Sequence, residues 1–120
     1  MSRTEDLKKF LTRELKTICE NVCYQQASDD IPFPYIVYDL SHKQYEVGKG
    51  YSIEINIWDR STSTKNVEMI ADDTEYLFDD TIYNENTFTA SIDLNTRNTV
   101  EDSDKRLKRR RLLFDMLYYD

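Results

Sequence analysis

Glycine and proline are scarce in this chain, with two of each among 120 residues. A phosphate-binding loop needs several glycines at fixed spacing, so nucleotide binding of the P-loop and Rossmann types is excluded. Collagen-like, linker-like and loop-dominated architectures are rich in glycine or proline and are excluded as well. The scarcity of both residues favours an ordinary folded domain.

Histidine and cysteine are also scarce, with one His and two Cys. Any Ser-His-Asp or Cys-His arrangement would have to use His42, which lies in a polar segment expected to be a surface loop. Cys19 and Cys23 lie four residues apart in a predicted helix, which favours two small buried side chains over a disulfide or a zinc site. We therefore expect a reducing environment, with no catalytic residue, metal site or cofactor.

Long apolar runs are absent, since no stretch approaches the roughly 18 apolar residues that a membrane span requires. The first residues are polar and charged, so neither a secretion signal nor membrane contact is expected. Aromatic residues, by contrast, are plentiful: nine Tyr, five Phe and one Trp supply packing material for a core. At 14.4 kDa, the chain fits a single domain over residues 1–120.

Two segments have the apolar spacing of amphipathic helices, with repeats of three and four residues. The first runs from about residue 3 to 25. It begins at a possible capping box of Ser2 and Glu5 and ends before the prolines of residues 28–34. The second runs from about residue 63 to 79, behind several Ser and Thr residues that can cap it. Each helix is expected to bury one stripe of apolar side chains.

Alternation of apolar and polar residues predicts strands elsewhere. Residues 51–58 have the clearest alternation and residues 88–95 repeat it, while residues 35–40 are rich in β-branched and aromatic side chains. Residues 41–50 are expected to form either a hairpin loop or a frayed extension of the flanking strands. Residues 95–104 are almost wholly polar, which suggests a long hairpin tip.

The segment 107–119 fits either a strand or a helix, since it also contains good helix formers. As a strand, it gathers these side chains on one face: Arg110, Leu112, Phe114, Met116 and Tyr118. We favour the strand, because the preceding strand needs a partner. The predicted fold is then α+β, an antiparallel sheet of about four strands in the order α-β-β-α-β-β, with both helices packed on one face.

The formal net charge is −7, yet six of the 16 basic residues fall within residues 105–111. Nucleic-acid binding is disfavoured, because a strand divides these side chains between two faces and the whole chain is acidic, with a pI of about 4.7. Two interpretations of the basic run stay open. It meets the acidic edge of a neighbouring copy in a head-to-tail ring, or it offsets nearby acids within the same molecule.

Five segments carry a likeness to a known family. They are the N-terminal helix, residues 33–39, the alternating strand that ends in residues 57–61, the helix of residues 64–78 and the closing strand with residues 110–114. In this order, and over nearly the whole chain, they resemble the tail-terminator, or tail-completion, proteins of long-tailed bacteriophages. Neighbouring head-to-tail joining proteins are similar in size and composition.

The resemblance implies a non-enzymatic virion protein at the tail-neck junction, assembled in the host cytoplasm. Such proteins are α+β subunits that form a ring, typically a hexamer, on the head-proximal end of the tail tube. The ring ends tube polymerisation and gives the head connector a surface on which to dock. The expected partners are further copies of the chain, the major tail tube protein and a head-closure or connector protein, with no specific nucleic-acid readout.

Charge and expected exposure, rather than the resemblance, select the interface residues. They are Lys105, Arg106, Lys108, Arg109, Arg110, Arg111, His42, Lys43 and Arg97. Two other functions remain as alternatives: another neck component, such as a head-closure or head-tail adaptor protein, and a monomeric protein-binding module. An enzyme would require a strongly perturbed His42 in a deep pocket.

Overall fold

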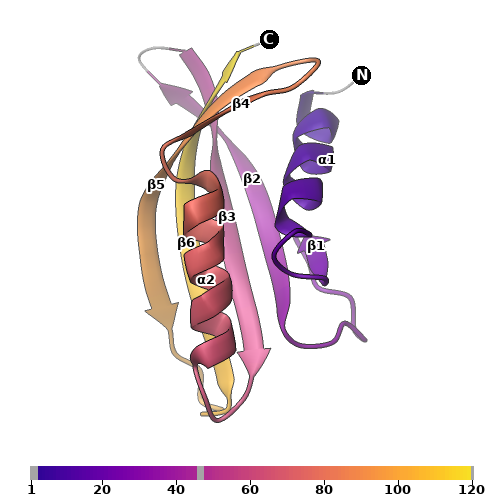
Figure 1. The fold of residues 1–120 in the computed structure, drawn as a ribbon, viewed down its shortest axis with the longest axis vertical. Coiled ribbons are helices and arrows are strands. Elements are labelled where there is room, and N and C mark those ends of the chain that lie inside the picture. The colour runs from indigo at the N-terminus through magenta and orange to yellow at the C-terminus, as the bar shows by residue number, and fades with distance from the viewer. Residues whose placement is uncertain (1–2, 46–47, 120) are drawn as a thin grey trace.

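The computed structural model describes residues 3–45 and 48–119, with two helices and six strands in that part of the chain. In chain order these are α1 (Arg3–Leu15), β1 (Val22–Tyr24), β2 (Tyr35–Tyr45), β3 (Gly48–Arg60), α2 (Lys65–Phe78), β4 (Thr81–Asn84), β5 (Thr89–Val100) and β6 (Leu107–Tyr119). The strands form one twisted sheet in the order β1-β2-β3-β6-β5-β4, which curls into a half-barrel (Figure 1). Neither helix in this described part is long and apolar enough to cross a membrane.

The predicted fold class is wrong in its sheet. The sheet has six strands rather than about four, and it is mixed, because β1 runs parallel to β2 while every other pair is antiparallel. The two unpredicted strands, β1 and β4, have three and four residues. Segments this short carry too little alternation to be read as strands, and pairing with a longer neighbour holds them extended.

The first helix is shorter than predicted, since α1 ends at Leu15 and not near residue 25. The amides of Ile18 and Cys19 both donate to the carbonyl of Leu15, and the hydroxyl of Thr17 donates to that of Glu14, so the last turn tightens and closes. The chain then reverses into β1. The sequence suggested that Cys19 and Cys23 lie in one helix, and this is wrong, because Cys19 follows the end of α1 and Cys23 lies in β1.

Two predicted loops are largely strand. β2 continues to Tyr45 and β3 begins at Gly48, so residues 41–50 extend the flanking strands; residues 46–47 lie outside the described part. Likewise β5 runs to Val100, and only the end of the predicted 95–104 tip is a turn. Long strands with polar exposed faces explain both errors, because a polar run does not by itself mark a loop.

The other predicted elements are confirmed. α2 lies within the predicted 63–79 helix, and β6 occupies 107–119 as a strand. Alternating side chains of β3 and β6 are fully buried, among them Ile53, Ile55, Ile57, Leu112 and Phe114. Phe10 of α1 packs edge-on against Phe78 of α2, with ring centres 6.5 Å apart, so both helices share this core on one side of the sheet.

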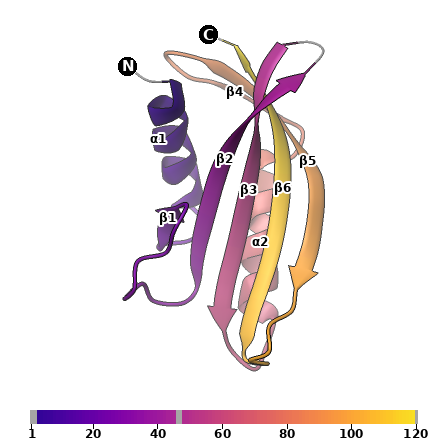
Figure 2. The same ribbon diagram turned by 180° about the vertical axis from the view of Figure 1, so that it is seen from behind.

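The opposite face of the sheet has no helix over it, as the view from behind shows (Figure 2). The strand register aligns Tyr35, Trp58, Arg109 and Val100 in one row across this open face. The basic run of the sequence lies in β6 and in the turn before it, so it reaches both faces at one end of the sheet.

Candidate interaction surface

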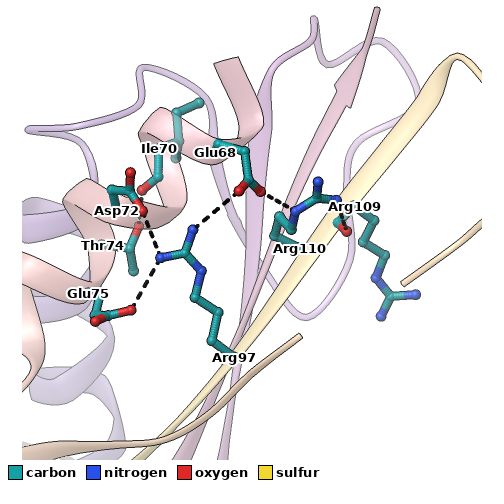
Figure 3. A network of polar contacts seen from close by, with 8 residues as sticks. All are labelled: Glu68, Ile70, Asp72, Thr74, Glu75, Arg97, Arg109 and Arg110. Atoms are coloured by element: carbon teal, nitrogen blue, oxygen red, sulfur yellow. Dashed lines mark hydrogen bonds and ion pairs between the residues drawn. The ribbon is translucent and has the colours of Figure 1, made fainter. Parts of the chain in front are cut away.

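Arg97 connects β5 to α2, with its guanidinium among three carboxylates (Figure 3). Its Nη1 lies 2.8 Å from Oδ1 of Asp72 and 3.2 Å from Oε1 of Glu75, and its Nη2 lies 3.8 Å from Glu68. Burial acts to lower the pKa of Arg97, but the hydrogen bonds to Asp72 and Glu75, together with the charges of Asp72 and Glu68, raise it on balance. Arg110 pairs through Nε with the same Glu68.

A β-bulge turns Arg97 toward the helix. The pairing of β5 with β6 shifts between Leu94 and Thr96, which leaves Asn95 as the extra residue. Without that shift, strict alternation would continue from Leu94 through Thr96 and place Arg97 on the open face. In the sequence, this bulge is indicated by the alternation of apolar and polar residues, which ends at Leu94.

On the open face, Arg109 lies over an aromatic ring. Its Nε and Nη2 donate to Oδ1 of Asn56 at 2.9 and 2.7 Å, and its guanidinium carbon lies 4.8 Å from the centre of the Trp58 ring. Trp58 in turn stacks on Tyr35, with ring centres 6.3 Å apart. A neutral amide and the Trp58 ring position this guanidinium, and its charge reaches Glu54 only through space, where it helps to lower the pKa of that carboxyl.

The neighbouring Arg111 is neutralised by Glu54. Arg111 Nε lies 3.2 Å from Glu54 Oε1, and the Asn56 side chain donates to the same carboxylate at 2.9 Å. The hydrogen bonds from Asn56 and then Arg111 lower the pKa of Glu54. Arg109, Asn56, Glu54 and Arg111 thus form one polar network across β3 and β6.

The rest of the basic run lies at the turn before β6. Lys105 and Arg106 are exposed, and Lys108 Nζ donates to the carbonyl of Lys105 at 2.6 Å. Lys105, Lys108 and Arg109 line a surface hollow of about 190 Å³, together with Glu101 and Asp102. This hollow is open to solvent and is lined by both positively and negatively charged side chains.

The structure does not bring all the predicted interface residues together. His42 and Lys43 lie near the other end of the sheet, where the His42 ring packs 4.7 Å from that of Tyr51 and Lys43 pairs with Asp115 at 3.3 Å. His42 shares a row with Met116, seven residues along β6 from Arg109 and so roughly 23 Å away. Arg97, Arg110 and Arg111 are largely used in ion pairs within the molecule.

The outer face of α2 is acidic. Its side chains and those just after it include these carboxylates: Asp72, Asp73, Glu75, Asp79 and Asp80. Tyr76 stands among them with 90% of its surface exposed. In residues 3–45 and 48–119, no three His, Cys, Asp or Glu side chains cluster closely enough to hold a metal ion.

Comparison with known proteins gives a likeness of fold. No protein-family model matches the chain, and no curated protein matches its sequence. Among solved structures, a chain in the virion of a native gene transfer agent particle superposes with a TM-score of 0.64. The match covers 88% of this chain and 84% of the other, at 10% sequence identity. At that identity the two chains share a fold, and the likeness says nothing about individual residues.

Proposed function

We propose that this protein is a non-enzymatic structural component of a virion. The observation that carries the proposal is the fold, which matches a chain of a gene transfer agent virion over 88% of the sequence. The same fold fits the resemblance of the five segments to the tail-terminator proteins. Two independent comparisons, one by pattern and one by shape, therefore point to the same kind of particle.

In this proposal the chain forms a ring, most simply a hexamer, on the head-proximal end of the tail tube. The ring stops tube polymerisation and offers a surface to the head-closure or connector protein. The sheet supports such contacts, because β4 pairs only with Thr89–Ile92 of β5. In the described part of the chain, the outer edge of β5 from residue 93 to 100 has no strand beside it, and a free edge is a template for pairing with another chain.

Tube length measures the proposed role directly. The major tail tube protein of the same particle would be polymerised with and without the purified protein, and the products examined by negative-stain microscopy. We expect shorter tubes, each with extra density at one end, and rings of the free protein at high concentration. Tubes of unchanged length whose ends carry none of this protein would overturn the proposal.

A further inference from the structure

Four cations at one end of the sheet form no ion pair with a carboxylate within the described part of the chain. They are Lys105, Arg106, Lys108 and Arg109, which we call the basic tip. Other cations of the same region are neutralised, as Arg110 is by Glu68 and Arg60 by Asp104. The intramolecular interpretation of the basic run thus holds for part of it, and the basic tip is the part left over.

The outer face of α2 carries an excess of negative charge. We call it the acidic face of α2, and it consists of Asp72, Asp73, Glu75, Tyr76 and Asp79, with Asp80 just beyond the helix. No basic residue lies in the last turn of α2, although a helix C-terminus is the end that favours cations. One guanidinium, that of Arg97, serves both Asp72 and Glu75. Asp73 and Asp80 have no ion pair among the described residues, so the charge here is poorly compensated within the molecule.

We infer that the acidic face of α2 in one copy binds the basic tip of the next copy. The two patches are different surfaces of the same chain, so this contact joins copies head to tail, and repetition closes a ring or extends a filament. The inference rests on the proposed ring, and it names the surfaces that meet. It also explains why a chain of net charge −7 keeps a cationic turn whose side chains form no ion pair within the described part of the molecule.

Each patch carries an anchor of the kind that dominates protein interfaces. Tyr76 projects from the acidic face, and Arg109 of the basic tip is held over Trp58. Tyr, Trp and Arg are the residue types most enriched among energetically dominant contacts. Arg106 and Arg109 pair well with carboxylates, and Tyr76 supplies apolar area that charge pairs alone lack.

The test uses two proteins, called the reversed proteins, in which some charges of one patch are reversed or removed while the other patch stays intact. The first is Lys105→Glu/Arg106→Glu. The second is Asp73→Lys/Asp80→Asn, where Asn suits the positive φ of 52° at residue 80. Lys16→Glu, at an exposed position on the chain after α1, is the matched control. Circular dichroism and thermal melts would verify that all variants fold.

Sedimentation velocity should show that each reversed protein needs at least about tenfold more protein to assemble than the wild type does. Mixing the two in equal amounts should give one-to-one pairs, because the native basic tip of the second protein still meets the native acidic face of the first. Tyr76→Ala should weaken assembly without changing its salt dependence, whereas the wild type should dissociate as salt rises.

The outcomes separate this contact from the proposed ring. If the wild type forms rings and both reversed proteins form them equally well, the contact is wrong and the ring stands. If the reversed proteins fail alone and also form no pairs when mixed, the charge pairing is wrong. If the wild type stays monomeric at high concentration and does not cap tail tubes, the ring is wrong and the contact with it.

Discussion

Arg97 and Asp72 join β5 to α2 through a contact of 2.8 Å between Nη1 and Oδ1. The two residues are 25 positions apart in the chain, and the bulge at Asn95 is what turns the arginine toward the helix. Arg97 also serves Glu75 and Glu68, and Glu68 is shared with Arg110. A residue predicted to meet a partner protein therefore has a structural task within its own chain.

Replacing Arg97 with Met should lower the free energy of unfolding by about 1 kcal/mol, after discounting for the exposure of the three carboxylates. The physical reason is that the aliphatic packing survives while Asp72 and Glu75 lose their cation and Glu68 keeps only Arg110. Urea denaturation measures the change. Arg60→Met is the control, because its pair with Asp104 is 48% and 38% exposed and should contribute little. Equal effects at both positions would contradict the role given to Arg97.

Phe10 anchors α1 to the core together with Leu7, Leu11 and Leu15, and it is the aromatic residue among them. It is 2% exposed, and its ring centre lies 4.9 Å from that of Tyr83 and 5.6 Å from that of Phe88. Phe10→Ala should cost about 3–5 kcal/mol, because the cavity adds to the lost burial. Phe10→Leu should cost clearly less. A loss below 1 kcal/mol for the alanine variant, measured by urea denaturation, would mean that α1 contributes little to the core.

How far the sequence predicts this fold depends on the length of each element. The strands with four alternating apolar residues, such as the one with Ile53 and Ile57, were predicted correctly because period-two burial leaves a clear pattern. β1 was missed because Val22 and Cys23 also continue the helical spacing of α1. The helix nevertheless ends at Leu15, because local hydrogen bonds close its last turn. The spacing of apolar residues does not reveal those hydrogen bonds.

The candidate interaction surface was only partly predictable. The charge excess of residues 105–111 is visible in the sequence, but which of those cations remain free depends on pairs between distant strands, such as Arg111 with Glu54. The sequence shows the acidic residues of α2 only as separate pairs of adjacent aspartates, Asp72 with Asp73 and Asp79 with Asp80. The significance of the acidic face of α2 appears only when Arg97 is seen to be the cation shared by Asp72 and Glu75.

The two thiols should differ strongly in reactivity. Cys19 is 7% exposed, its thiol lies 3.6 Å from the carbonyl oxygens of Asn21 and Pro34, and burial raises its pKa. Because the thiolate is the reactive form, alkylation of native Cys19 should be slow. In the Cys23→Ser variant, native labelling with iodoacetamide should be at least about tenfold slower than in Cys19→Ser. Equal rates would show that Cys19 is accessible.

Stability should fall in acid partly through Glu54. Hydrogen bonds from Asn56 and Arg111 lower its pKa in the folded protein from the ordinary value of 4.5. A carboxyl whose folded pKa is depressed stabilises the protein above its unfolded pKa, and that contribution is lost as the pH falls through the folded value.

The Glu54→Gln variant removes this titration. The difference in unfolding free energy between wild type and Glu54→Gln should therefore be constant near neutral pH and should shrink as the pH drops below about 4.5. Urea denaturation at a series of pH values measures it. In Arg111→Met, which keeps the Asn56 bond, introducing Glu54→Gln should give a smaller pH-dependent difference. A difference that stays constant through the acid range would mean that neither contact stabilises the ionised carboxyl.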